Sequence, residues 1–143
     1  MSKILVIGQA PPIQAQTVPY DTTLFYTMLE WVGVTKGSAQ ELFKFAALLD
    51  EFPGKTKFGG HKAPTKKQAL PRVQNIIIPL ADKHDKIILF GLPVQKTFFK
   101  IDTLQIEIRG KYYCLPHPSK RNWNIIMNNR DLITDILNSC LYE

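Results

Sequence analysis

Residues 112–123 of the chain read YYCLPHPSKRNW, a short β-prone run that ends at a histidine held between two prolines. Proline fixes its own φ and restricts the residue before it, so His117 is expected on a stiff loop at the end of a strand. In open α/β folds, ligands bind beyond the carboxyl ends of the strands. A hydroxyl, two cations, an amide and an indole follow, and these groups suit an anionic ligand with a flat ring. The alternative is a surface loop whose prolines only end the strand.

The composition predicts one compact domain that spans residues 1–143. Hydrophobic residues make up 45% and charged residues 21%, which excludes a disordered chain, and no apolar run approaches the ~20 residues that a membrane span needs. The apolar stretch within residues 1–8 is too short for a signal peptide and is typical of a first strand. The two cysteines, Cys114 and Cys140, are too few for a four-thiolate iron–sulfur or zinc site. A reducing cytoplasm is the expected compartment.

The chain is basic, with 18 lysines and arginines against 12 aspartates and glutamates and a formal net charge of +6. This balance favours a polyanionic partner, although many small basic proteins bind no nucleic acid. The cations gather at two places, one in and just after the Gly/Pro-rich residues 51–64 and one after the histidine, and we expect them to form two electropositive lips. They are Lys55, Lys57, His61, Lys62, Lys66 and Lys67 at the first, and Lys120 and Arg121 at the second.

The strands are predicted from short apolar runs that end at turn residues. Residues 4–7 and 87–90 are continuously apolar, as in strands that are buried on both faces of a parallel sheet. Residues 104–108 alternate as an edge strand, and a turn at 109–111 leads into the strand 112–115. Residues 43–49 are apolar enough for either a helix or a strand, and periodicity does not decide between them.

Helices are predicted from caps and from apolar residues at helical spacing. One is expected at 22–32, a second from the capping box at 38–41, and a third from the capping box at 65–68, in which Pro71 either makes a kink or lies in an early turn. A short helix through 95–98 and a closing helix that is capped near Asn128 or Asn129 follow. Strands and helices thus alternate, which predicts a three-layer α/β/α sandwich with a mainly parallel central sheet. Loops 8–12, 91–95 and 116–123 would then meet at the strand ends.

These three loops together resemble the motifs of the uracil-DNA glycosylase superfamily. The residues Gly8-Gln9-Ala10-Pro11-Pro12 are similar to its first motif, and Phe90-Gly91-Leu92-Pro93-Val94-Gln95 to its central strand–glycine segment. The residues Pro116-His117-Pro118-Ser119, with Arg121 and Asn122, are similar to its second motif. The stretch Ala63-Pro64-Thr65-Lys66-Lys67-Gln68 is similar to the corresponding stretch of the iron–sulfur (family 4) branch. The resemblance therefore covers nearly all 143 residues, in a trimmed form.

The resemblance implies a uracil-DNA-glycosylase-like fold and a monofunctional DNA glycosylase. Such an enzyme flips a damaged base, here uracil first of all, out of DNA and hydrolyses its N-glycosidic bond without metal or cofactor. His117 would donate a hydrogen bond to the departing base, and Gln9 would orient the attacking water. The base would contact Gly8, Ala10, Pro11 and Tyr20, with Tyr20 stacking on it. The DNA would be bound by Ser119, Lys120, Arg121, Asn122, Gly91 and Gln95.

The chain departs from the family pattern at three points. Ala10 stands where the best-known members have a carboxylate or asparagine that activates water, and Gln9 stands where the family 4 branch has a glutamate. Asp21 is a candidate substitute carboxylate, although a helix cap is the commoner role. The asparagine that reads the pyrimidine edge is missing, since Ala46 and Ala47 occupy the expected region. The iron–sulfur cysteines are missing as well.

Other interpretations stay open at this point. The chain is also compatible with a weakly active or inactive DNA- or base-binding module of the same fold, or with an N-ribohydrolase of free nucleosides or nucleotides. Phe43 or Phe45 could replace Tyr20 in stacking, but aromatic residues in apolar runs are usually core. Lys120 or Trp123 could fill the space that the base leaves, while the alternative for Trp123 is packing against the closing helix. We expect a monomer that binds single- or double-stranded DNA and does not bind a membrane. If the protein is bacterial, we expect it to be associated with the nucleoid.

Overall fold

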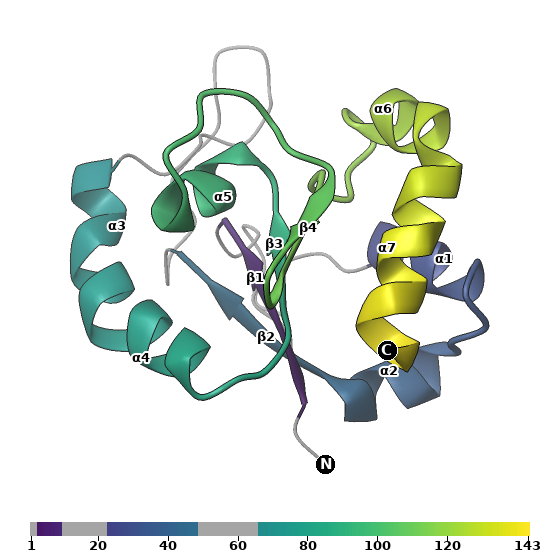
Figure 1. The fold of residues 1–143 in the computed structure, drawn as a ribbon, viewed down its shortest axis with the longest axis horizontal. Coiled ribbons are helices and arrows are strands. Elements are labelled where there is room, and N and C mark those ends of the chain that lie inside the picture. The colour runs from purple at the N-terminus through teal and green to yellow at the C-terminus, as the bar shows by residue number, and fades with distance from the viewer. Residues whose placement is uncertain (1–2, 10–22, 49–65) are drawn as a thin grey trace.

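A five-stranded sheet forms the centre of the computed structural model, which describes residues 3–9, 23–48 and 66–143, with only the backbone described at residues 66, 68 and 69 (Figure 1). The strand order is β2-β1-β3-β5-β4. The strands are β1 (Ile4–Gly8), β2 (Phe43–Ala47), β3 (Ile87–Phe90), β4 (Glu107–Arg109) and β5 (Tyr112–Leu115). The first three and β5 run parallel, and only β4, at the edge, is antiparallel to its neighbour. The prediction of a mainly parallel α/β sheet is confirmed.

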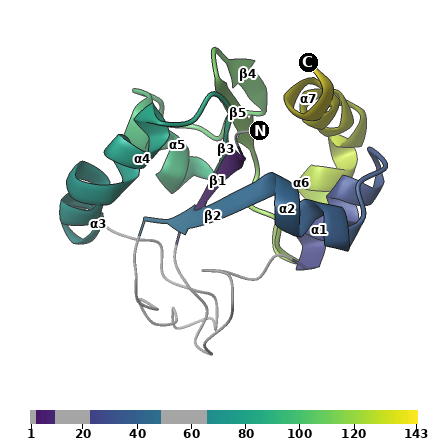
Figure 2. The same ribbon diagram turned by 90° about the horizontal axis from the view of Figure 1, so that it is seen from below.

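Helices cover both faces of this sheet, as Figure 2 shows. On one side lie α1 (Thr23–Glu30), α2 (Lys36–Leu42), α6 (Trp123–Asn128) and α7 (Arg130–Tyr142). On the other side lie α3 (Lys66–Arg72), a π-helical segment (Val73–Ile77), α4 (Ile78–Asp82) and α5 (Leu92–Phe98). The described residues therefore form the three layers that the alternation of strands and helices predicts.

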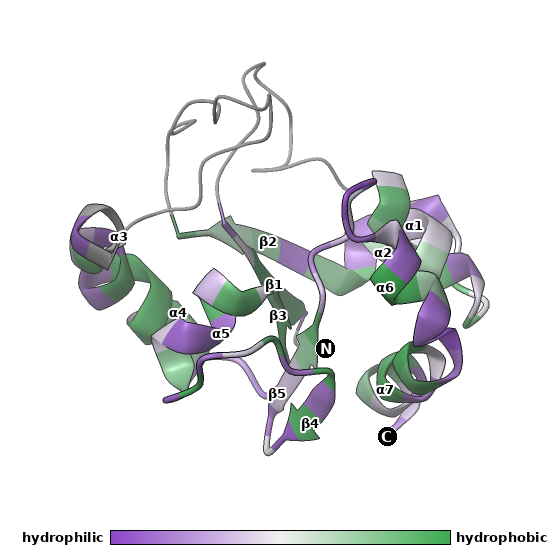
Figure 3. Ribbon diagram, turned by 90° about the horizontal axis from the view of Figure 1, so that it is seen from above, coloured by the Kyte–Doolittle hydropathy of each residue, from purple (hydrophilic) through white to green (hydrophobic). Residues whose placement is uncertain are grey.

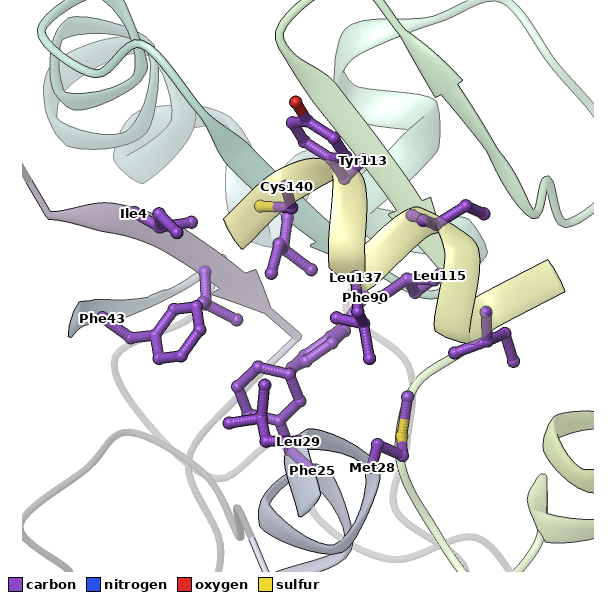
Figure 4. Packing of buried hydrophobic residues seen from close by; sticks show 14 of the residues in the cluster. Ile4, Phe25, Met28, Leu29, Phe43, Phe90, Tyr113, Leu115, Leu137 and Cys140 are labelled. Atoms are coloured by element: carbon purple, nitrogen blue, oxygen red, sulfur yellow. The ribbon is translucent and has the colours of Figure 1, made fainter. Parts of the chain in front are cut away.

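The central strands are buried on both faces because every residue in them is apolar. In β1, Ile4 and Val6 join one hydrophobic cluster, while Leu5 and Ile7 join the other. The hydrophobic colouring along β1 in Figure 3 reflects this pattern. The cluster under α1 and α7 is rich in aromatic residues, and Figure 4 shows Phe25, Phe43 and Phe90 packed together there. Such two-sided burial is typical of parallel sheets.

The edge strand β2 resolves the ambiguity of residues 43–49. Its backbone pairs in parallel with β1, from Ile4 opposite Phe43 to Gly8 opposite Ala47. One side chain, Lys44, is exposed, which fits an edge strand better than a strand in the middle of the sheet. Pairing with β1 therefore decides a choice that the local sequence leaves open.

Two helices differ most from the predictions, and a proline lies inside a third. The second helix begins at Lys36 rather than at the Ser38 capping box, because Thr35 is the N-cap and its hydroxyl accepts a hydrogen bond from the Ser38 N–H at 3.3 Å. Helix α6 was not predicted, since six residues between polar flanks give little periodicity. Pro71 lies inside α3, which passes directly into the π-helical segment. A proline has no N–H for the helical ladder, and a local change of helix type accommodates the loss.

Two lysines cap helices at the amino-terminal edge of the sheet, opposite the strand ends where the site is expected. Lys86 donates to the Cys140 carbonyl near the end of α7 at 2.6 Å. Lys111 donates to the carbonyls of Ala81 and His84, at and just after the end of α4, at 2.9 and 3.1 Å. Cations stabilise helix C-termini, where carbonyls lack helical partners and the dipole is negative. Part of the lysine excess is therefore structural.

In the described ranges, no helix is long and apolar enough to cross a bilayer.

The two cysteine thiols are buried on opposite faces of the sheet. Burial raises the pKa of Cys114 to about 11 and the pKa of Cys140 to about 12, from an ordinary value of 9.0. The unfolded chain loses these protons above about pH 9, whereas the folded chain keeps them until the pH approaches the raised values. The contribution of the thiols to the free energy of unfolding is therefore complete below pH 9 and is lost as the pH rises toward 11–12.

We therefore expect the urea midpoint to fall when the pH rises from about 8 to about 10.5. A Cys114→Ala/Cys140→Ala variant removes both thiols, so its midpoint should fall less over the same range, whatever its absolute stability. Urea unfolding of both proteins, followed by circular dichroism, measures this difference. An equally steep fall in the variant would contradict the assignment.

Candidate functional site

The carboxyl ends of β1, β3 and β5 bring one residue from each of three loops together. Gln9 follows β1, Gly91 follows β3, and His117 lies two residues after β5. A Cβ atom placed on Gly91 would lie 3.3 Å from Nε2 of Gln9 and 3.4 Å from Cβ of His117. The side chains of Gln9 and His117 thus both approach the point where a Cβ of residue 91 would lie. The predicted meeting of the three loops is present at these residues.

The backbone of Gly91 makes this approach possible. Its φ of 87° and ψ of 166° lie in a region that only glycine adopts readily. Its N–H donates to the Leu115 carbonyl at 2.9 Å, which ties the end of β3 to the end of β5 just before the histidine loop. The absence of a side chain leaves room for Gln9 and His117. Gly91 is itself buried, so we assign it this structural role rather than a direct contact with DNA.

His117 is half-buried between two buried prolines. Its ring meets the buried ring of Phe90 edge-on, with the ring centroids 6.2 Å apart and the planes at 78°. The Asn122 side chain donates to the His117 backbone carbonyl at 3.0 Å. The histidine is thus held by aromatic packing, by restricted backbone and by a side-chain hydrogen bond. The prediction of a histidine on a constrained loop directly after a strand is confirmed.

The residues after His117 form a compact turn that leads into α6. The Asn122 N–H donates to the Ser119 hydroxyl at 3.3 Å and to the Ser119 carbonyl at 3.2 Å. Ser119 and Asn122 are half-buried, while Lys120 and Arg121 are exposed at the tip of the turn. The turn therefore presents two cations to solvent within a few residues of the histidine.

Gln95 has a different role from the predicted contact with DNA. Its side chain is fully buried. Its amide nitrogen donates to the carbonyls of Gln105 and Leu115 at 3.1 and 3.2 Å, and its oxygen accepts from the Gln105 N–H at 2.8 Å. These bonds join α5, the end of β5 and the segment before β4. We correct the prediction accordingly, because a buried side chain with these partners cannot reach a phosphate.

The end of β2 adds a residue that sequence reasoning missed. Ala47 lies opposite Gly8 in the sheet, so the carboxyl end of β2 borders the first loop. The Ala47 carbonyl accepts a hydrogen bond from Nε of Arg72, at the end of α3, at 2.7 Å. Both Ala46 and Ala47 are buried and bring no polar side chain to this border. Arg72 therefore supplies a part-buried cation there, and no local motif signals a contact across 25 residues.

Several predicted site residues are not placed by the structure or belong to the core. Phe43 and Phe45 lie edge-on to Phe25, at centroid distances of 5.3 and 6.2 Å, which is typical of core packing. Gly8 is buried in β1, with its carbonyl accepting from the Leu48 N–H at 3.0 Å. Outside the described residues lie Ala10, Pro11, Tyr20 and Asp21, together with Lys55, Lys57, His61 and Lys62 of the first basic group.

The chemistry that the site offers is that of hydrogen-bond donors. The Gln9 carboxamide and the Cβ of His117 both approach Gly91, and the carboxamide and the imidazole can each donate to an oxygen that gains negative charge. A carboxamide can also orient a water molecule, but it cannot take a proton from it at neutral pH. The arrangement therefore suits a reaction in which stabilisation of charge matters more than removal of a proton.

Comparison with known proteins gives no family assignment: no protein-family model matches the chain, and no curated protein matches it significantly. Function must therefore be inferred from the residues themselves and their positions. Gln9, Gly91 and His117 lie far apart in sequence and meet in space.

Replacement of Gly91 by alanine tests this geometry. The variant combines an unfavourable backbone conformation with contacts to Gln9 and His117, so we expect it to lose about 1–3 kcal/mol of unfolding free energy. We also expect the NMR signals of the Gln9 side chain and the His117 ring to move.

The matched control is Gly110→Ala, because Gly110 also has a positive φ, 61°, but has nothing within 4 Å of the added Cβ. It should cost some stability and leave the two site signals in place. If Gly91→Ala shifted them no more than Gly110→Ala does, the three loops would be farther apart than described.

Proposed function

We propose that the chain is a DNA glycosylase, which extrudes a damaged base from DNA and hydrolyses the bond between that base and its sugar. Uracil is the first candidate base. The observation that carries the proposal is the meeting of Gln9 and His117 over Gly91 at the carboxyl ends of a mainly parallel sheet. These residues come from the segments that resemble the superfamily's motifs, and they offer donors of the kind that the reaction needs.

Cleavage of the N-glycosidic bond leaves positive charge on the sugar and negative charge on the departing base. A donor aimed at a carbonyl oxygen of that base strengthens its hydrogen bond as the charge develops, so it stabilises the transition state more than the substrate. His117 takes this role in the proposal. A neutral imidazole with one N–H is sufficient for this role. The loop restricts the backbone of His117, and the contact with Phe90 of β3 restricts its ring.

Water must then attack the sugar carbon. Gln9 lies beside the glycine that separates it from His117, and its carboxamide can hold a water molecule by accepting or donating a hydrogen bond. It cannot act as a general base. The mechanism that fits these residues is dissociative, with bond breaking ahead of water attack, because a sugar cation reacts readily with a water that is only oriented. The proton that this water then loses passes to the departed base anion or to solvent.

The turn after His117 would hold the DNA backbone next to the extruded base. Ser119 uses its hydroxyl oxygen to accept from the Asn122 N–H, and the hydroxyl proton stays available for a phosphate oxygen. Lys120 and Arg121 are exposed and add charge attraction without sequence preference. The short distance along the chain from these cations to His117 places phosphate contacts close to the chemistry.

The residues at the end of β2 bear on which base the site accepts. Relatives in the resembled superfamily use an asparagine to read the pyrimidine edge, whereas Ala46 and Ala47 are buried at the end of β2. Arg72 borders the same region and brings donors only, which would favour a base with carbonyl oxygens at its edge. Uracil has two such oxygens, and so do several oxidised pyrimidines.

A glycosylase assay on a panel of oligonucleotides tests the function. Each oligonucleotide carries one modified base, in single- or double-stranded form, and alkali converts every abasic product into a strand break. We expect breaks at uracil or at another carbonyl-rich pyrimidine. The His117→Ala variant should cleave roughly 10²-fold more slowly under single-turnover conditions, with folding intact, because a donor to the departing base is lost.

His84→Ala is the control, since the His84 ring hydrogen-bonds to the Leu80 carbonyl at 2.8 Å, near the amino-terminal edge of the sheet. It should cleave at nearly the wild-type rate. Binding of the panel without any strand break would point to an inactive binding module instead. Release of base from free deoxyuridine with no action on DNA would point to a nucleoside hydrolase. An unchanged rate for His117→Ala would remove His117 from the mechanism.

A further inference from the structure

Both tryptophans of the chain lie together in one surface cluster with an arginine, which we call the tryptophan face (Trp31, Trp123 and Arg130). Trp31 follows α1, Trp123 begins α6, and Arg130 begins α7. The two indole rings are 6.0 Å apart at 46°, and the Arg130 guanidinium lies over the Trp31 ring at 4.6 Å from its centroid. Three separate elements thus contribute one aromatic and cationic surface.

The tryptophan face is only partly used by the core. Both indoles pack against the hydrophobic cluster beneath them, yet both stay half-exposed, and Arg130 is exposed. One turn after Trp123, Met127 is 40% exposed and extends the apolar surface along α6. An arginine that stacks on an indole keeps its positive charge and its free donors. Packing against the cluster accounts for the buried part of each indole, while the part that stays exposed and the stacked cation have no role in the core.

The face continues directly from the turn that carries the proposed phosphate contacts. The backbone N–H of Trp123 donates to the Lys120 carbonyl at 3.3 Å. Lys120 and Arg121, just before Trp123 in the chain, are exposed. The turn and the tryptophan face together therefore contain three cations and two indoles. Two exposed carboxylates, Glu30 and Asp131, adjoin Trp31 and Arg130 in sequence, so the charge is concentrated toward the turn rather than spread evenly.

We propose that the tryptophan face binds unpaired nucleotides on one side of the extruded base, by stacking bases on the indoles and pairing a phosphate with Arg130. The proposal rests on the proposed function, since it takes DNA as the substrate, and it adds a preference for one strand form. Stacking needs bases whose faces are free. Partly exposed aromatic rings with neighbouring cations can stack on any such base and pair with its phosphate. A base in a duplex is covered on both faces by its neighbours, so single-stranded DNA is the favoured partner.

Intrinsic fluorescence tests the proposal, because the only two tryptophans of the chain are the two in the face. We titrate the full chain with undamaged oligothymidine and with a duplex of equal length, and record tryptophan emission. Stacking quenches indole emission, so the single strand should quench it with a saturating curve, and the duplex should quench it more weakly. Trp31→Phe and Trp123→Phe, each with one indole left, report which ring is contacted.

Arg130→Gln removes the stacked cation and keeps both indoles. Its affinity for oligothymidine should fall about 5-fold or more, and the salt dependence of binding should weaken by the loss of about one phosphate contact. The control is Lys44→Gln, because Lys44 is an exposed cation on the edge strand β2, away from the face. It should bind with nearly the wild-type affinity. Thermal unfolding by circular dichroism identifies any variant that fails to fold.

The two proposals fail in different ways. Cleavage at a damaged base, with tryptophan emission unchanged by saturating DNA, would overturn the tryptophan face and leave the glycosylase standing. Saturable quenching that is lost in Arg130→Gln, in a protein that cleaves no modified base, would support the face as a single-strand binding surface without the glycosylase. Equal quenching by duplex and single strand would overturn the preference for unpaired nucleotides.

Discussion

The close approach of three strand ends is the constraint on which the rest of the site depends. Gly91 has a backbone conformation that other residues avoid, and its missing side chain leaves room for Gln9 and His117 on either side. A hydrogen bond from Gly91 to Leu115 fixes the spacing of two of these ends. Gln95 is buried, and its side-chain amide bonds to Gln105 and to Leu115 at the end of β5. The site is thus held by the backbone of Gly91 and by the buried side chain of Gln95.

The sheet supplies that rigidity through burial on both sides. Residues such as Leu5 and Val6 are fully buried in opposite clusters, and each side chain of this kind contributes about 1.5–3 kcal/mol when removed from water. The parallel register sets which residues end next to one another, and a slip of one residue would turn every side chain to the other face. Phe90 connects the core with the site, since it packs on Phe25 in the core and on His117 in the site.

Much of the fold was predictable because most of the central strands are short, continuous apolar runs that end at turn residues. Two other elements were less predictable: β2 is a strand because β1 pairs with it, and α2 begins at Lys36 because Thr35, rather than Ser38, is its N-cap. The meeting of Gln9, Gly91 and His117 followed from motif order and strand direction. Gln95 was misassigned because the resemblance placed it among the DNA-binding residues, and Arg72 was missed because its contact with Ala47 spans 25 residues.

The central claim is that an extruded base contacts the His117 ring. The most direct measurement is the ¹⁵N NMR spectrum of the imidazoles during titration with an oligonucleotide that carries 2′-fluoro-deoxyuridine, because fluorine slows cleavage and preserves the complex. His84, bonded to Leu80 at the other end of the sheet, serves as an internal reference. The account predicts that the His117 signals move with this oligonucleotide, move less with an undamaged one, and that those of His84 stay in place. Unmoved His117 signals in a saturated complex would contradict it.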